Sequence, residues 1–359
     1  MFKEKKFLYK IKRKYNVTER IFDKKSLYLD RNEKFVEFPS PIKKELIYKL
    51  SKINPGLYPN LSFFYKKLSK FLSISKQEIF LTEGVSGAIK SLIECYTEIG
   101  KSEIVYPFPT FAMYSIYSKM FNLKVKKIGY NQNFDLDFDL LLNSINKSTA
   151  IVFLPNPNIP IEGFLNKNKL LMLIKKCKST KTILAIDEVY YPFSKFSAVK
   201  LIKSYDKLFI LRSFSKAFGL AGIRLGYIIS NKNNIEYISK IRTGYESNSY
   251  SMEIGSYFID NYNLITKYIS EVKLGLKIFR QKLIKNNIQF IGGTNSCYIF
   301  LNLKNKNKCE LIINQLQKEN IYVRGGWPAP YKNFILVSGT TLNNFNKFIV
   351  KFFKIINQN

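Results

Sequence analysis

The sequence of 359 residues contains no histidine and only one tryptophan. Without histidine, the chain can form neither a Ser-His or Cys-His catalytic pair nor a metal site with imidazole ligands. Acid–base chemistry near neutral pH must therefore depend on Lys, Tyr, Cys or carboxylate side chains, or on a bound cofactor.

Cysteine is also scarce, and Cys95, Cys177, Cys297 and Cys309 show no CxxC spacing. Isolated cysteines in a chain of this length are typical of reduced thiols, which predicts a cytoplasmic protein, and we expect no metal centre. The amino-terminal residues lack the continuous apolar segment of a signal peptide. No run reaches about 18 apolar residues, so no membrane span is predicted.

Acidic residues are few, with 26 Asp and Glu against 58 Lys and Arg, which gives a formal net charge of +32. Only 8 of the basic residues are Arg, and the Lys residues are spread along the chain among abundant Asn and Ile. This composition is typical of AT-rich coding sequence, whereas nucleic-acid-binding proteins tend to cluster their cations. The one dense segment, Lys3–Lys14, is interpreted as a solvated helix face, and we expect no nucleic-acid or membrane partner.

The apolar fraction of 46% is sufficient for a packed core. Apolar runs alternate with segments of helical periodicity, which predicts an α/β fold with a mostly parallel sheet of seven strands. After Arg242 the pattern predicts a long helix at Ser251–Lys285, followed by a smaller α+β unit. We therefore expect an arm at 1–40 that packs with the small domain, a large cofactor-binding domain at 41–245 and a small domain at 246–359. The predicted strands are Ile79–Thr82, Glu103–Tyr106, Lys124–Ile128, Ala150–Leu154, Thr182–Ile186, Lys207–Leu211 and Leu225–Ile229.

The most informative segment is LRSFSKAFGLAGIRLGY at Leu211–Tyr227. An apolar strand ends in Ser213, Ser215 and Lys216, and small residues then lead to Arg224. Two hydroxyl groups that flank a lysine at a strand end suit an anion site, and open α/β sheets bind ligands at that edge.

Other polar residues follow neighbouring strands. An apolar strand leads directly into Asp187, and a buried carboxylate requires a cationic partner, which a protonated ring nitrogen could supply. Tyr190 follows three residues later, and the segment Asn156–Pro160 follows another strand. Gly84 begins a predicted helix, whose first N–H groups can bind a phosphate.

In this order, the motifs resemble those of the fold-type I pyridoxal phosphate enzymes, in particular the branch of histidinol-phosphate aminotransferase and threonine-phosphate decarboxylase. The resemblance covers nearly the whole chain. It also includes the motifs LDRNE at Leu29–Glu33, YP at Tyr58-Pro59, PTF at Pro109–Phe111 and YVR at Tyr322–Arg324.

The resemblance implies a role for each matching residue. Lys216 would form the imine with pyridoxal 5'-phosphate and move protons, Asp187 would pair with the ring nitrogen, and Tyr190 and Asn158 would bond the ring hydroxyl. Phe111 would stack on the ring. The phosphate would be bound by Gly84, Val85, Ser86, Ser213, Ser215 and Arg224, with Tyr58 reaching it from the other subunit of a homodimer.

Some positions depart from the family pattern. The motif NPNNPTG becomes Asn156–Gly163 with Ile159 in place of the second Asn, so that the register of Asn158 is open. The family's arginine in the late strand is replaced by Ile335. The substrate-binding candidates are Arg324, Asn32, Tyr245 and Arg31, and Arg242 and Lys332 are further cations that could replace the lost arginine.

We therefore expect an aminotransferase for a small, phosphorylated amine or amino acid and its ketone. A decarboxylase of a phospho-amino acid is the alternative, because the same cofactor supports both reactions and the bond aligned with its π-system decides which breaks. A basic nucleic-acid-binding protein with an inactive fold is a remote third possibility.

Overall fold

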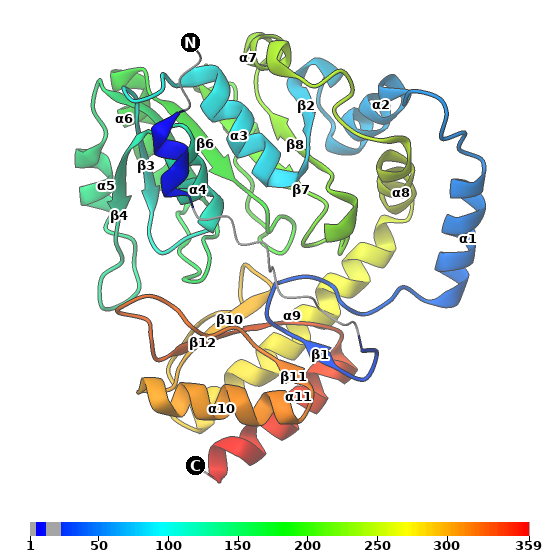
Figure 1. The fold of residues 1–359 in the computed structure, drawn as a ribbon, viewed down its shortest axis with the longest axis vertical. Helices are drawn as coiled ribbons and strands as arrows, with labels where there is room; N and C mark the ends of the chain where they lie inside the picture. Colours follow the sequence, from blue (N-terminus) through cyan, green and yellow to red (C-terminus); the bar gives the residue numbers. More distant parts are fainter. Residues whose placement is uncertain (1–4, 12–22, 359) are drawn as a thin grey trace.

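The computed structural model describes residues 5–11 and 23–358. Figure 1 shows a large sheet with its helices in the upper part of the molecule, and a small sheet with its own helices in the lower part. Part of the basic segment Lys3–Lys14 lies outside the described residues. Within them, no helix is long and apolar enough to cross a membrane.

The large sheet has seven strands in the order β2-β8-β7-β6-β5-β3-β4. β8 is antiparallel to both of its neighbours, and the other pairs are parallel. The prediction of a mostly parallel sheet of seven strands is therefore confirmed. The strands are β2 (Ile79–Thr82), β3 (Glu103–Pro107), β4 (Lys124–Ile128), β5 (Thr149–Pro155), β6 (Ile183–Asp187), β7 (Leu208–Ser213) and β8 (Gly226–Ile229).

Both faces of this sheet are covered, which explains its continuous apolar strands. In β6, Ile183 and Ala185 pack into one apolar cluster with α3, while Leu184 and Ile186 pack into the other. The helices that precede residue 249 in the chain are α1 (Ser40–Ser51), α2 (Leu61–Leu72), α3 (Gly84–Tyr96), α4 (Ala112–Met120), α5 (Phe138–Ser144), α6 (Lys167–Thr180) and α7 (Lys232–Ile238), with short 3-10 turns η1 (Lys6–Lys10), η2 (Lys76–Glu78), η3 (Val199–Leu201), η4 (Ala221–Ile223) and η5 (Ser239–Ile241).

The second sheet is antiparallel, with β10 (Tyr298–Asn302) between β9 (Phe290–Gly292) and β12 (Phe334–Ser338). It packs with α9 (Tyr262–Lys285), α10 (Lys306–Lys318) and α11 (Leu342–Asn357) (Figure 1). Phe345, Phe348 and Phe352 on one face of α11 surround Phe279 of α9, so this unit has its own aromatic core.

One predicted element is wrong. The expected helix at Ser251–Lys285 is two helices, α8 (Ser249–Asp260) and α9, which are separated at Asn261 by a non-helical backbone with ψ 44. Phe258 of α8 packs against Phe38, and Gly255 lies so close to Phe64 that a side chain there would meet its ring. Helix α8 thus packs against the elements that precede the large sheet, whereas α9 continues into the second unit.

The amino-terminal segment reaches the second unit before the first helix begins. Strand β1 (Leu27–Tyr28) pairs in parallel with β11 (Ile321–Tyr322), and the N–H of Ser338 donates to the carbonyl of Leu29 over 2.8 Å. The domain boundaries at 40/41 and 245/246 stay a prediction. The pairing explains how residues near 30 come to lie beside the carboxyl ends of the large sheet.

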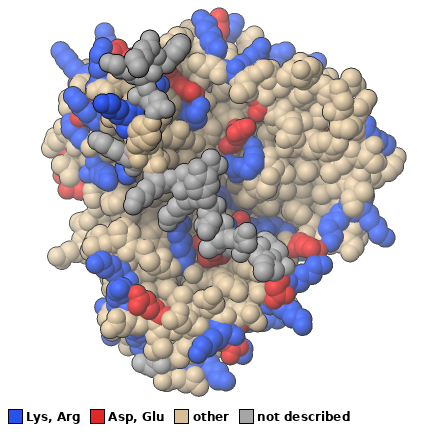
Figure 2. Space-filling model, in the orientation of Figure 1, with Lys and Arg blue, Asp and Glu red and all other residues tan. Residues whose placement is uncertain are grey.

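Figure 2 shows Lys and Arg spread over the visible face and interspersed with Asp and Glu, without one dominant patch. The high net charge is therefore a property of most of this surface.

Candidate active site

A cavity of about 270 Å³ lies at the carboxyl ends of β6 and β7, beside the amino end of α3. It brings together residues from seven separate segments of the chain, as expected for a site at this edge of an open sheet. The predicted residues that line it are Arg31, Asn32, Val85, Ser86, Phe111, Asp187, Tyr190, Ser213, Ser215, Lys216, Arg224 and Arg324.

Asp187 ends β6 with its carboxylate fully buried. The hydroxyl of Tyr114 donates to Oδ2 over 2.7 Å, and the N–H of Val189 donates to Oδ1 over 2.9 Å. Burial raises the pKa of Asp187 to about 6, and these two hydrogen bonds limit the rise. Both donors are neutral, so the carboxylate can still pair with a cation in the cavity.

Tyr114 was not predicted from the sequence. It lies on α4, and its ring packs against Tyr106 and Phe153 like an ordinary core residue. The available signal was its place three residues after Phe111, which puts both on one side of the same helix turn.

Lys216 follows β7, and its Nζ donates to the carbonyl oxygen of Arg31 over 3.0 Å. Burial lowers the pKa of Lys216, with smaller effects of nearby charges. A lowered pKa increases the fraction of neutral amine, which is the nucleophilic form.

Gly84 begins α3 with a left-handed φ of +65°. A Cβ atom there would lie 2.7 Å from Nη2 of Arg224, and L side chains rarely adopt this φ, so glycine suits the position. The N–H groups of Val85 and Ser86 belong to the first turn, where a helix offers no carbonyl acceptor. Both residues line the same cavity, and the first N–H groups of a helix suit an anion.

Arg224 and two serines form the other side of this anion site. The guanidinium of Arg224 donates to the carbonyls of Glu83 over 3.2 Å and Ala221 over 3.1 Å, which fixes its position. The hydroxyl of Ser213 accepts from the N–H of Ser215 over 3.1 Å, and the two hydroxyl groups are 2.9 Å apart. The hydroxyl groups of Ser213 and Ser215, the guanidinium of Arg224 and the amino end of α3 thus line one anion site.

Asn158 does not line the cavity. Its amide donates to the carbonyl of Pro109 over 2.9 Å and to the hydroxyl of Tyr130 over 2.6 Å, and it accepts from Thr110 over 2.6 Å. Ile159 lines the cavity in its place. The predicted bond from Asn158 to a ring hydroxyl is therefore not supported by this geometry, because the side chain is engaged elsewhere.

Tyr58 and Tyr245 also lie outside the cavity. Their rings stack with centroids 4.5 Å apart, and Tyr58 is 80% exposed. Both line a neighbouring hollow of about 550 Å³ that shares Arg224 with the cavity. They lie on the outer side of the predicted phosphate site.

Arg324 enters the cavity from the segment after β11, with its guanidinium carbon 4.5 Å from the centroid of the Trp327 ring. Ile335 is fully buried on β12 and does not line the cavity, and neither do Arg242 and Lys332. The lost family arginine is therefore not replaced from β12 or by these two residues.

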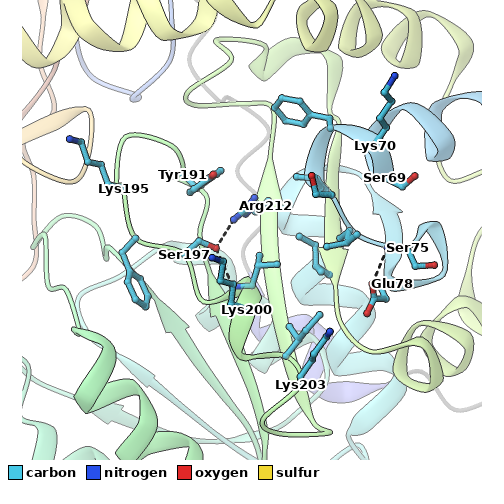
Figure 3. A pocket seen from close by; sticks show the side chains of 18 of the residues that line it. Ser69, Lys70, Ser75, Glu78, Tyr191, Lys195, Ser197, Lys200, Lys203 and Arg212 are labelled. Atoms are coloured by element: carbon cyan, nitrogen blue, oxygen red, sulfur yellow. Dashed lines mark hydrogen bonds between the residues drawn. The ribbon is translucent and has the colours of Figure 1, made fainter.

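A larger hollow of about 1250 Å³ lies elsewhere on the large sheet and contains none of the predicted site residues. Figure 3 shows Arg212 directed toward Ser197, with Lys195, Lys200 and Lys203 around the hollow. Arg212 is paired with Glu188 over 2.9 Å, and both side chains are buried. Arg212 thus bonds to Glu188 and to Ser197, which lines the same hollow. The reactive groups predicted from the sequence gather in the smaller cavity, which is therefore the candidate active site.

Comparisons with known proteins agree with this assignment. The family model described as aminotransferase class I and II matches residues 28–348. The histidinol-phosphate aminotransferase of Pyrococcus furiosus is 30% identical over 261 residues, which cover 72% of this chain and 75% of that protein.

Two solved structures share the fold. The histidinol-phosphate aminotransferase from Sinorhizobium meliloti, in complex with pyridoxal-5'-phosphate, has a TM-score of 0.83 at 16% identity, covering 93% of this chain and 91% of that one. The L-threonine-O-3-phosphate decarboxylase from Porphyromonas gingivalis has a TM-score of 0.76 at 18% identity, covering 92% and 99%. The chain therefore belongs to the class I and II aminotransferases, a family of pyridoxal phosphate-dependent enzymes.

Proposed function

We propose that this aminotransferase acts on a small phosphorylated amine or amino acid and the corresponding ketone. The observation that carries the proposal is the cavity in which Lys216 and the buried Asp187 lie together with further cationic side chains. The histidinol-phosphate aminotransferases among its relatives support a phosphorylated substrate.

The residues of the cavity fit pyridoxal 5'-phosphate. Among the described residues, the carboxylate of Asp187 accepts hydrogen bonds only from two neutral donors, Tyr114 and Val189, and burial raises its pKa. A cationic ring nitrogen in the cavity would suit such a carboxylate as a partner. The close approach of Gly84 and Arg224 suits the cofactor phosphate. When bound, the cofactor supplies an electron sink for the carbanion that develops on the substrate.

Each residue of the cavity would have its own role toward the cofactor and the substrate. Asp187 would keep the ring nitrogen protonated, and Lys216 would hold the cofactor covalently and then move a proton to or from the substrate carbon. Tyr190 would bond the ring hydroxyl, and Phe111 would cover the ring. Gly84, Val85, Ser86, Ser213, Ser215 and Arg224 would bind the phosphate.

The test is to purify the protein and Lys216→Ala with pyridoxal phosphate and compare cofactor retention and turnover. After borohydride reduction, mass spectrometry should find the cofactor bound to the wild type and not to K216A. With L-histidinol phosphate and 2-oxoglutarate, only the wild type should form glutamate. The exposed Lys200→Ala is the matched control and should behave as wild type. Covalent attachment of the cofactor to K216A after borohydride reduction would contradict the assignment of the lysine.

A decarboxylase of a phospho-amino acid is the second candidate. The fold shared with L-threonine-O-3-phosphate decarboxylase favours it, although other neighbours with higher TM-scores are histidinol-phosphate aminotransferases. Carbon dioxide release from O-phospho-L-serine or O-phospho-L-threonine, without glutamate-dependent ketone formation, would establish it over transamination.

The active protein is further proposed to be a homodimer with shared sites. Helix α1 has no buried residue, and Ile47, Tyr48, Leu57 and Tyr58 are all more than half exposed. An apolar patch of this kind indicates a protein interface, and Tyr58 borders the hollow that contains Arg224. If Tyr58 serves the site of the other subunit, mixing inactive K216A with Tyr58→Ala should restore activity, since one site of each mixed dimer is intact.

We further propose that the protein is cytoplasmic. All four cysteines are free, in accord with a reducing, cytoplasmic environment. Nucleic-acid binding is the remote alternative, and duplex DNA binding that persists at physiological salt would support it.

A further inference from the structure

The segment of residues 29–38 touches the loop that carries Lys216 at two points. At the first, the carbonyl of Arg31 accepts a hydrogen bond from Nζ of Lys216 over 3.0 Å. At the second, three residues further along both segments, the side chain of Lys34 lies against Gly219. Lys34 does not line the cavity and has no role in binding the cofactor, so its contact with this loop calls for another explanation.

Gly219 allows a close approach of the Lys34 stem. A Cβ atom at position 219 would lie 2.6 Å from Cδ and 2.8 Å from Cβ of Lys34. Gly219 has a φ of +69°, which L side chains rarely adopt, and its N–H donates to the carbonyl of Lys216 over 3.1 Å. The Lys34 stem therefore packs directly on the backbone turn that follows Lys216.

The ammonium group of Lys34 is fixed within its own segment. Nζ donates to the carbonyl of Val36 and lies 3.8 Å from the centroid of the Phe38 ring. The Phe38 ring packs in turn on Phe258 of α8, with centroids 4.6 Å apart. Burial lowers the pKa of Lys34 to about 8, in accord with an ammonium partly removed from water, where a cation–π contact is stronger. These contacts hold the stem in one conformation over Gly219.

The same segment is also fixed to the second unit. The N–H of Asn32 donates to the hydroxyl of Ser338 on β12 over 2.8 Å. Arg31 thus lies between this bond on one side and the contact of Lys34 with the loop on the other. Both restrict the movement of the Arg31 carbonyl relative to the reactive amine.

We propose that Lys34 is a positioning residue, which keeps the carbonyl of Arg31 against the free amine of Lys216 and so orients this amine for its reactions. The inference rests on the role proposed for Lys216. Attachment of the cofactor forms a C=N bond between this amine and the aldehyde carbon with loss of water, and its rate depends on the orientation of the amine. Lys34 acts only through the backbone of Arg31 and touches none of the reacting atoms.

The contact itself can be tested from the side of the loop, by urea unfolding of the cofactor-free protein. Gly219→Ala should lower the unfolding midpoint more than Gly100→Ala, because Gly100 also has a positive φ, +78°, but its Cβ would meet an ordinary contact at 3.4 Å. In the background of Lys34→Gly, which clears the space, the two losses should be similar. An excess loss in G219A of the same size in both backgrounds would show that Lys34 is not the obstacle, and would overturn the inference.

The positioning role is tested by the rate at which the cofactor-free protein attaches pyridoxal 5'-phosphate, with borohydride quenching at successive times and mass spectrometry. Lys34→Ala removes the stem and the charge, and should slow attachment about tenfold. Lys34→Arg keeps both and should restore most of the rate, whereas Lys34→Met keeps the stem alone and should lie between. Lys169→Ala is the matched control and should react as the wild type, because this exposed lysine lies 5.4 Å from the Phe138 ring centroid and does not line the cavity.

Pyridoxine 5'-phosphate, which lacks the aldehyde, separates orientation of the amine from damage to the cofactor site. Its dissociation constant should be little changed in K34A, because the residues at the amino end of α3 are untouched. Attachment at the wild-type rate in K34A would overturn the inference and leave the proposed function in place, and so would weaker pyridoxine phosphate binding that accounts for the slow attachment. A wild type that attaches no cofactor would reject the role proposed for Lys216, and this inference with it.

Discussion

Nδ2 of Asn32 donates a hydrogen bond of 2.9 Å to the phenol oxygen of Tyr190, although the two residues are 158 positions apart. Asn32 also accepts from the hydroxyl of Ser338, so one side chain connects the amino-terminal segment, β12 and the loop after β6. All of these bonds are buried. The orientation of the Tyr190 hydroxyl in the cavity therefore depends on a residue outside the large sheet.

Asn32 has a φ of 53°, which lies in the left-handed region. Replacing it should therefore separate the loss of its side-chain hydrogen bonds from the backbone strain at this φ. Asn32→Gly should lower the free energy of unfolding by about 1–3 kcal/mol through the lost buried hydrogen bonds. Asn32→Ala should lose about 1 kcal/mol more, because alanine is strained at this φ. Urea denaturation provides the measurement. The exposed Asn287 has a φ of 51°, so N287G and N287A should report the strain alone. An equal loss in N32G and N287G would contradict the role of the side chain.

The pKa of Asp187 predicts a pH dependence of stability. Burial raises this pKa from 3.8 to about 6, so the folded, cofactor-free protein binds more protons than the unfolded chain between about pH 4 and 6. Its free energy of unfolding should fall as the pH rises through this window, by about 3 kcal/mol in total. Asp187→Asn removes the titrating group, and should be more stable than the wild type at pH 8 but not near pH 4.

Urea unfolding of both cofactor-free proteins from pH 4 to 8 measures this difference. With cofactor bound, the order should reverse, because D187N cannot hold the ring nitrogen as an ion pair. A stability difference that is independent of pH would refute the assignment of the titration to Asp187.

Glu162 connects the loop after β5 to the turn between β9 and β10. Its carboxylate accepts from the N–H groups of Gly293 over 2.9 Å and Asn295 over 2.8 Å, and from the hydroxyl of Ser296. Glu162→Ala would leave these donors without their acceptor, and should cost about 3 kcal/mol of unfolding free energy. Glu162→Gln keeps one oxygen and should cost about 1 kcal/mol. Thermal melting is the measurement, with the exposed Glu319→Gln as a control expected to change little.

The buried pair of Glu188 and Arg212 should behave differently from a surface ion pair. Arg212 also stacks on Tyr191, with its guanidinium carbon 3.6 Å from the ring centroid. Glu188→Ala leaves a buried positive charge uncompensated, and should lower the free energy of unfolding by about 3–5 kcal/mol. The double variant E188A/R212A should lose less than the sum of the single losses. Additive losses in guanidinium denaturation would show that the two side chains do not interact.

Much of the large sheet could be predicted because its strands are buried on both faces and therefore appear as continuous apolar runs. The same physics located Asp187 and Lys216, since polar residues directly after such runs must lie at the carboxyl edge of the sheet. The break at Asn261 was missed because apolar periodicity continues through it from α8 into α9. Tyr114 was missed because a buried tyrosine has the same sequence pattern whether or not its hydroxyl serves a carboxylate.

The sequence by itself determined the fold class and the family, and it predicted the residues of the candidate site, even though it contains no histidine to carry acid–base chemistry. Those features depend on local patterns and on motifs whose order is visible along the chain. Only the tertiary structure decided that Ile159 lines the cavity while Asn158 does not, and that Arg31 and Arg324 both line it. These outcomes depend on which side a loop residue faces and on contacts between segments some 300 residues apart, as between Asn32 and Ser338, separated by 306. Spacing along the chain carries no information about either.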